Sequence, residues 1–473
     1  MIKIFKIASV LLIATLVFLF TCSKKTTEPE PTEFKWTILG YFDGNHSQDR
    51  APDGESYVIK DLQELEQIGS TGDVQVLVML GSFKTDGKCK YYHVKTDSSE
   101  VLLDLDTTDM SDPMTLRDFV SFGIQNYSAE HYMLIINDHG RGWKGICSDT
   151  IKGKGNWMSL PDLSSALSGF GFDIIWFYTP SMATAEVAYQ IKDRADYMIA
   201  SQFKWYPDNI MGSTEWLPYL TDNPDIDVWR FAWKVTEAIK KAAQEISTAK
   251  HVHTVLIHLP KISKVAADIS NLGRVLIEST GSYWNEVWDA WEPSHVYKDC
   301  DSAFVHLREF AHQIQNQPNL NSAIRDDAQA LEASINAAEL EEFMHPDYPA
   351  TELGGISIHL PWNQDDFDST NYAQLDFSET NWHSFISVFI QSFLGNYAGA
   401  LNIKSIPTGA RVFLNEVDTG DTTDVIIGGL LPGYYEVKLV KSGYRDYTFF
   451  ETSYEVEPQD TTDLPTAHLL PGP

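Results

Sequence analysis

The sequence predicts an α/β fold with a mostly parallel sheet and helices on both faces, a helical extension and a C-terminal all-β sandwich. Strand-like and helix-like segments alternate from Lys35 onward, which is typical of parallel sheets built from strand–helix–strand units. Some strand-like segments are near-continuous apolar runs such as VQVLVML, as expected for strands covered on both faces. Around Gly399 the pattern changes to short strands separated by Gly, Pro and Asp.

The elements of the α/β part follow one another in regular order. We expect strands at 36–42, 74–80, 131–137, 172–178 and 197–203, and helices at 57–69, 115–127, 160–170 and 184–195, where apolar residues recur at helical spacing. From Asp227 to about Ser392 the pattern is mainly helical, with strand-like inserts HTVLIHL and GGISIHL. Ligands of open parallel sheets bind outside the carboxyl ends of the strands. The segments IINDHGRGW and WFYTPSMA, at two such ends, therefore predict the functional site.

Length and charge limit the classes of function. With 473 residues, the chain is long enough for two or three domains, each with its own core. A formal net charge of -31 excludes nucleic acid as an expected partner, because phosphates would be repelled. Neither a peptide or protein ligand nor any oligomeric state is excluded by composition.

The first residues are typical of an export signal. Lys3 and Lys6 precede an uncharged apolar run that ends before Cys22 and is short for a membrane span of about 20 residues. The end of the run resembles a bacterial lipoprotein cleavage box, in which the cysteine is acylated. We expect a signal peptide at 1–22 and a linker at 23–34, which would anchor an exported protein to the membrane of the cell envelope. An ordinary signal peptide or an uncleaved anchor is the alternative.

The remaining cysteines and the histidines indicate little on their own. Cys89, Cys147 and Cys300 are an odd number, so no complete disulfide framework is implied, and bridges from Cys147 to either of the others stay open. The histidines are scattered, without HxxxH or CxxC spacing. We therefore expect no metal site and no cofactor.

The two predicted strand ends have the layout of a hydrolase site. Such a site needs a nucleophile and a base within hydrogen-bond reach. His139 directly follows the strand YMLIIN, and Gly140 allows the backbone to turn sharply and approach a substrate. The second strand end carries Thr179, Pro180 and Ser181 at the turn where a nucleophile is expected.

These segments resemble the clostripain family of cysteine peptidases, relatives of the caspase-like fold. The resemblance covers residues 35–392 and includes WTILGYFDG, HYMLIINDHGRGWKGICSD, FDIIWFYTPSMATAEV and GGISIHLP. Residues 399–473 resemble a PEGA domain, a surface-associated β-sandwich, through SIPTGA, PGY and KSGY. The first resemblance implies a caspase-like sheet and a His–Cys pair, and the second implies a spacing or envelope-binding role.

The family motif at the second strand end is approximately F-D-A-C-L-M-G-S-x-E-V. Aligned with it, His139 and Gly140 match the base motif, whereas Pro180 falls on the nucleophilic cysteine. Tyr178 falls on the acidic residue that binds Arg or Lys of the substrate, and Gln202 on a glutamate. Because proline has no attacking group, the resemblance implies a pseudopeptidase that binds a peptide or an envelope component.

Two alternatives remain open at this point. An active hydrolase would use Ser181, which we expect to point away from the position of Pro180 in an extended segment, or Cys147, which we expect to be structural. The aromatic residues around the predicted cleft either pack in the core or line a groove that binds peptide or glycan; they are Trp143, Trp176, Tyr178, Trp205 and Tyr206.

Overall fold

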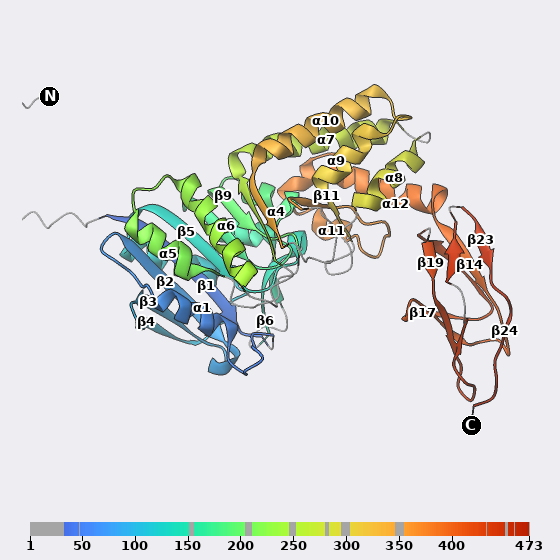
Figure 1. Ribbon diagram of the computed structural model, residues 1–473, viewed down its shortest axis with the longest axis horizontal. Coiled ribbons are helices and arrows are strands. Elements are labelled where there is room, and N and C mark those ends of the chain that lie inside the picture. The colour runs from blue at the N-terminus through green and yellow to red at the C-terminus, as the bar shows by residue number, and fades with distance from the viewer. Residues whose placement is uncertain are drawn as a thin grey trace, which may run out of the picture.

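The computed structural model describes residues 33–46, 48–150, 156–203, 211–245, 252–279, 283–294, 303–345, 354–431, 433–449, 453–457 and 459–472. Figure 1 shows an α/β body that continues into a helical extension, and a separate strand-rich body beyond α12 (Trp382–Asn396). The predicted fold class is confirmed. The predicted signal peptide with Cys22, and most of the linker, lie outside the described residues.

A large mixed sheet forms the centre of the α/β body. Within the described residues it has nine strands in the order β12-β10-β9-β8-β5-β1-β2-β3-β4. Strands β9, β8, β5, β1 and β2 run parallel, and each flanking strand pairs in antiparallel direction with its inner neighbour. The bounds are β1 Phe34–Gly44, β2 Val74–Ser82, β3 Lys88–Lys95, β4 Ser98–Thr107, β5 Ala129–Asn137, β8 Phe172–Tyr178, β9 Ala195–Ala200, β10 His253–His258 and β12 Glu339–Met344.

Helices cover both faces of this sheet because successive residues of each strand face opposite sides. One core contains Ile174 and Trp176 of β8 and lies under α1, α5 and α6. The other contains Ile175 and Phe177 and lies under α2, α3, α4 and α7. The bounds are α1 Tyr57–Glu66, α2 Pro113–Asn126, α3 Leu160–Ala166, α4 Ala185–Gln190, α5 Ser213–Asp222, α6 Val228–Glu245 and α7 Ile262–Glu278.

Local capping explains where several of these helices begin. Ser56 accepts a hydrogen bond from the backbone N–H of Ile59 at the start of α1. Asp112 caps α2 in the same way, and Pro113 occupies its first turn, where a missing N–H costs nothing. Thr184 caps α4 directly after the turn that follows β8, so this helix starts close to the predicted site.

The helical extension packs on the second face. Trp288 of α8 stacks on Phe389 of α12 with ring centroids 4.1 Å apart, which joins two segments distant in the sequence. The extension comprises α8 Trp284–Ser294, α9 Leu307–Asn316, α10 Ser322–Ala338, α11 Ser369–Tyr372 and α12, with short strands β11 Phe304–His306 and β13 Ser357–His359. A hairpin near the sheet is formed by β6 Ile146–Asp149 and β7 Asn156–Met158.

The C-terminal body is built from short strands around its own apolar core. That core includes Leu401, Val412 and Leu439 and is separate from the two cores of the α/β body. The strands are β14 Gly399–Ile403, β15 Ser405–Ile406, β16 Arg411–Leu414, β17 Val417–Thr422, β18 Val425–Leu430, β19 Gly433–Tyr435, β20 Val437–Val440, β21 Tyr447–Thr448, β22 Tyr454–Val456, β23 Thr461–Asp463 and β24 Ala467–His468.

One hairpin of the sheet was not expected from the sequence, and both strand-like inserts of the helical part form strands. The antiparallel strands β3 and β4 were not predicted. The insert HTVLIHL forms β10 and extends the central sheet in antiparallel direction. The insert GGISIHL contributes β13, which pairs with β11 in a separate small sheet.

Among the described helices, no segment combines the length and apolar character that crossing a bilayer requires.

His359 at the end of β13 is an unusual core residue. It is fully buried, and its ring contacts Trp143, Phe304 and Tyr372. Among the described residues, neither ring nitrogen has a hydrogen-bond partner. Burial lowers the pKa of His359 well below its usual value, and the positive charge of Lys144 lowers it further. The folded protein therefore holds this imidazole neutral.

We predict that His359→Phe reduces the loss of stability on acidification. Below pH ~6.5 the unfolded chain protonates this histidine and the folded chain does not, so the wild type loses up to about 1.4 kcal/mol per pH unit through this group. Urea unfolding between pH 7.5 and 4.5 measures the difference, with the half-exposed His312 changed to Phe as the control. If the free energy of unfolding depends on pH equally in His359→Phe and in the wild type, His359 is not held neutral in the folded protein.

Candidate functional site

Strand register brings the predicted site residues to one edge of the sheet. Asn137, the last residue of β5, pairs with Phe42 of β1 on one side and with Tyr178 of β8 on the other. The chain builds β2 on one side of β1 and β5, β8 and β9 on the other, so β1 and β5 flank the point where the strand order reverses. Ligands of open α/β sheets bind in the crevice at such a point.

The turn after β5 is held against the turn after β8. The backbone N–H of Cys147 donates to the carbonyl of His139 at 3.1 Å, and Gly140 forms a bridge with Ile146. A Cβ atom on Gly140 would lie 2.2 Å from the carbonyl oxygen of Pro180. Gly140 was expected to permit close approach of a substrate; here the absence of its side chain permits close approach of the Pro180 backbone.

The His139 imidazole is half-buried. Its ring lies 4.2 Å from that of His46 and 6.3 Å from that of Trp157, measured between centroids. Burial lowers the pKa of His139, and the neighbouring His46 lowers it further, against the opposing charge of Asp138. The imidazole is therefore neutral at neutral pH, the form that can accept a proton or bind a metal.

Pro180 and Ser181 form the turn after β8 and are both half-buried. Ser181 has a φ of 60° and donates its N–H to the carbonyl of Phe203 at 3.2 Å. The expectation that Ser181 lies in an extended segment is wrong, because the chain turns at this residue. Within the described part of the chain, no hydrogen bond joins the His139 ring to a hydroxyl or a thiol.

Cys147 lies inside the core rather than at the surface of the crevice. Its side chain is fully buried. Burial raises the pKa of the Cys147 thiol well above its usual value, and the charges of Asp138 and Asp43 act in the same direction, so the nucleophilic thiolate is disfavoured. Cys147 is a free thiol, so no disulfide joins it to Cys89; Cys300 lies outside the described residues.

Two residues that differ from the family motif are also buried: Tyr178, aligned with the substrate-binding acidic residue, and Gln202, aligned with a glutamate. Tyr178 is 7% exposed and packs on Trp176 in the core beneath α5 and α6. Gln202 is 2% exposed, and its side-chain amide lies 2.9 Å from Nδ1 of His306. Neither side chain is presented to solvent in the crevice.

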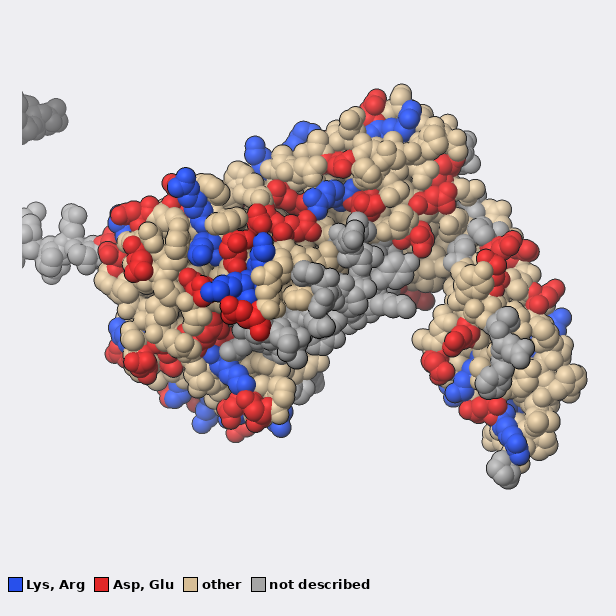
Figure 2. Space-filling view, in the orientation of Figure 1, with Lys and Arg blue, Asp and Glu red and all other residues tan. Residues whose placement is uncertain are grey.

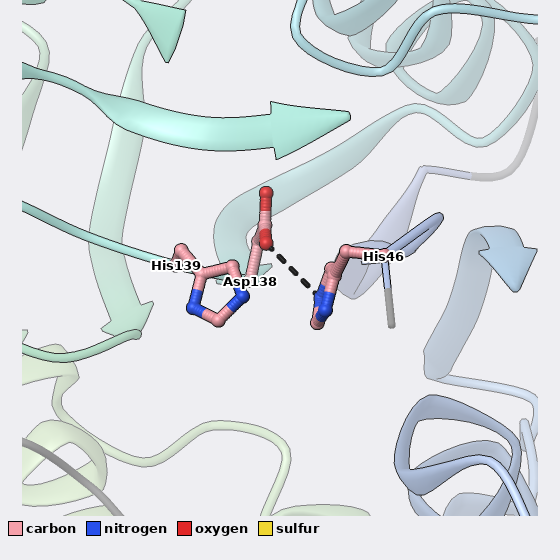
Figure 3. Close-up of side chains that lie close together, drawn as sticks. All are labelled: His46, Asp138 and His139. Carbon is pink, nitrogen blue, oxygen red and sulfur yellow. Dashed lines mark ion pairs between the residues drawn. The ribbon is translucent and has the colours of Figure 1, made fainter. Parts of the chain in front are cut away.

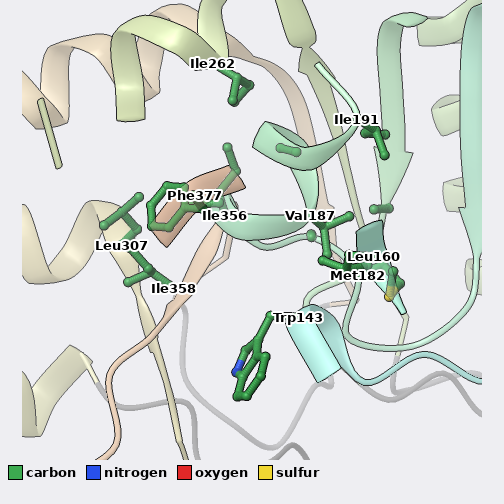
Figure 4. Packing of buried hydrophobic residues seen from close by; sticks show 14 of the residues in the cluster. Trp143, Leu160, Met182, Val187, Ile191, Ile262, Leu307, Ile356, Ile358 and Phe377 are labelled. Atoms are coloured by element: carbon green, nitrogen blue, oxygen red, sulfur yellow. The ribbon is translucent and has the colours of Figure 1, made fainter. Parts of the chain in front are cut away.

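Aromatic residues near the site are mostly core residues. Trp143 and Trp176 are 4% and 0% exposed, and Figure 4 shows Trp143 among apolar side chains that include Met182. Their packing favours the core interpretation over an aromatic-lined groove. Trp205 and Tyr206 lie outside the described residues.

Sequence reasoning missed His46, which follows β1. Its Nε2 lies 3.3 Å from Oδ1 of Asp138, and Figure 3 shows both beside the ring of His139. Oδ2 of Asp138 accepts the backbone N–H of Ser148 at 2.5 Å. Although Asp138 and His139 are adjacent in the chain, ligand atoms of these two residues and His46 all lie within 4.8 Å of one another. The pairing of β1 with β5 was the only signal that could have found His46.

We predict that Gly140→Ala destabilises the protein by about 1–3 kcal/mol, because the new methyl group collides with the Pro180 backbone. Gly171 directly precedes β8, and a Cβ atom on it would meet no other heavy atom within 4 Å, so Gly171→Ala should stay within about 0.5 kcal/mol of wild type. Chemical denaturation of both variants measures this. Equal stability of the two would show that the turns are not in close contact.

Comparisons with known proteins agree with this architecture. Residues 48–390 match the model of the clostripain family, and residues 398–464 match that of the PEGA domain. Clostripain of Hathewaya histolytica is 28% identical over 137 residues, which is 25% of this chain and 25% of that protein. The matched region is thus about a quarter of that relative's length.

Solved structures show the same fold at low identity. A secreted C11 cysteine protease from Bacteroides thetaiotaomicron, solved with an irreversible peptide inhibitor, has a TM-score of 0.55 at 18% identity, covering 74% of this chain and 99% of that one. An inactive zymogen C11 protease from Parabacteroides distasonis has a TM-score of 0.54 at 21% identity, with the same coverage. With its family model matched over most of its length, the chain belongs to the clostripain family of cysteine peptidases and carries a PEGA domain at its C-terminal end.

Proposed function

We propose that this chain is an exported, lipid-anchored member of the clostripain family that has lost the catalytic cysteine and binds a peptide or an envelope component without cleaving it. The observation that carries the proposal is Pro180, which stands where the family motif has its nucleophile. A proline offers neither a thiol nor a hydroxyl, so acyl transfer has no attacking atom at this position.

The surroundings of Pro180 support this proposal. Cys147 is fully buried and its thiol has a raised pKa, which makes it a poor substitute nucleophile. Ser181 has no hydrogen bond to the His139 ring among the described residues, and an unactivated serine is a weak nucleophile. The alternative of an active hydrolase that uses Ser181 or Cys147 with His139 therefore needs a rearranged turn.

Tyr178 replaces the acidic residue that binds Arg or Lys of the substrate in the family motif, and this replacement changes what the crevice would bind. Tyr178 is buried against Trp176 and offers no carboxylate to an Arg or Lys of a ligand. Preference for basic residues is therefore not expected from this position. We propose that recognition rests on the remaining half-buried surface of the two turns, to which His139, Pro180 and Ser181 contribute.

Export and anchoring are supported by the N-terminal pattern and by a relative. Lys3 and Lys6, the apolar run and Cys22 fit a lipoprotein signal, and the related protease from Bacteroides thetaiotaomicron is a secreted protein. Figure 2 shows Asp and Glu spread over both bodies with Lys and Arg among them, which suits solubility outside the cell better than a single anionic binding site.

The C-terminal module supports an envelope-directed role. It has a separate core and exposes Val417, Ile426 and Tyr434, each more than 60% accessible. We propose that it spaces the α/β body from the membrane or contacts an envelope component.

We predict that the purified chain does not cleave peptides containing Arg or Lys and that His139→Ala leaves this result unchanged. Quenched fluorescent peptide substrates measure turnover, and fluorescence anisotropy of labelled peptides measures binding in the same samples. Binding without turnover supports the proposal. Turnover that disappears in His139→Ala would instead establish an active peptidase.

A further inference from the structure

We propose that His46, Asp138 and His139 bind a divalent transition-metal ion of the zinc class in the crevice between the ends of β1 and β5. Each residue offers one ligand atom, and these atoms all lie within 4.8 Å of one another. In Figure 3 the two imidazole rings lie close together beside the Asp138 carboxylate, and their planes are tilted by 48°. The proposal does not depend on whether the protein cleaves peptides.

The distances are close to those of a tetrahedral site. Metal–nitrogen and metal–oxygen bonds of about 2.0–2.2 Å place two ligands of a tetrahedral ion about 3.4 Å apart. Nε2 of His46 and Oδ1 of Asp138 are 3.3 Å apart. The rings of His46 and His139 have centroids 4.2 Å apart, so they would move apart by about 1 Å to hold the ion between them.

The orientation of the Asp138 carboxylate suits a ligand. Its Oδ2 accepts a hydrogen bond from the backbone N–H of Ser148 at 2.5 Å. This hydrogen bond fixes the orientation of the carboxylate, as hydrogen bonds to metal ligands generally do. Its Oδ1 lies 3.3 Å from Nε2 of His46 and accepts no backbone hydrogen bond within the described part of the chain. The backbone therefore holds one oxygen and leaves the other directed at the imidazoles.

A second buried carboxyl group beside the three ligands also favours a cation in this crevice. Asp43 is fully buried, and its Oδ2 has no hydrogen-bond partner among the described residues. It lies close enough to Asp138 and Asp149 for their charges to act on it. Asp43 and Asp138 are thus two buried carboxyl groups close to each other, and an uncompensated buried carboxylate is costly. A divalent ion held by Asp138 would offset their negative charge.

The ligand types indicate which ions would bind. Two imidazole nitrogens and one carboxylate oxygen suit Zn²⁺, Co²⁺ or Ni²⁺, and leave a fourth position for water or a ligand atom. Ca²⁺ takes six to eight oxygen ligands and should bind poorly here. The sequence-based expectation of no metal site rested on local spacing, which cannot detect ligands that meet only through strand pairing.

The test uses the tag-free full chain, stripped with a chelator. Calorimetric titration with Zn²⁺ should give one site per chain, and Co²⁺ should give the intense visible absorption of a tetrahedral site. Zn²⁺ should also raise the midpoint of thermal unfolding, whereas Ca²⁺ should not. Absence of a one-to-one site in the wild type would overturn the proposal.

Three variants assign the site. His46→Gln, Asp138→Asn and His139→Gln should each weaken Zn²⁺ binding at least about tenfold, whereas His312→Gln, at a half-exposed position of α9, should leave it unchanged. Circular dichroism checks that each variant folds, and Asp138→Asn keeps an oxygen for the Ser148 N–H. If all three folded variants bind Zn²⁺ like the wild type, the ion lies elsewhere and the proposal is wrong.

Discussion

Pairing of β5 with β1 on one side and β8 on the other is the constraint on which the rest of the site depends. Because Phe42, Asn137 and Tyr178 are level across the three strands, the residues that follow them emerge at the same edge. A slip of one residue would turn every side chain of a strand to the opposite face and exchange the two cores. The buried strands therefore fix which side chains meet in the crevice.

This constraint explains how the family resemblance survives the change at Pro180. The residues that anchor the motif, Phe177, Met182, Glu186 and Val187, are all fully buried. Glu186 accepts hydrogen bonds from the backbone N–H of His359 and the hydroxyl of Tyr372, so it ties the turn after β8 to the helical extension. These residues are required for packing whether or not the turn carries a nucleophile, since a buried group without its partner is costly.

The sequence predicted the fold well where burial is strong and periodic. The apolar runs of β2 and β8 are typical of buried strands, and the spacing of apolar residues in α1 is typical of a helix with one buried face. The hairpin β3–β4 was missed because β4 is largely exposed and carries Glu100, Asp104 and Asp106 among its apolar residues. Antiparallel joining of β10 was also missed, since an apolar run does not reveal its direction in the sheet.

The site was predicted only in part, for a related reason. His139, Gly140 and the turn at Pro180 follow strands that are visible in the sequence. His46 follows an equally visible strand, yet no local motif connects it with Asp138 or His139, and only the neighbouring positions of β1 and β5 bring them together. Burial of Cys147 and Tyr178 likewise depends on packing around the turns rather than on spacing.

Covalent labelling tests the central claim, that no nucleophile faces His139, most directly. The wild type and Pro180→Cys are treated with a fluorophosphonate and a peptidyl chloromethylketone, and adducts are located by peptide mass spectrometry. The account predicts no adduct at Ser181 or Cys147 in the wild type, and a ketone adduct at position 180 of the variant that weakens when His139 is also changed to Ala. An adduct at Ser181 or Cys147 of the wild type would contradict it.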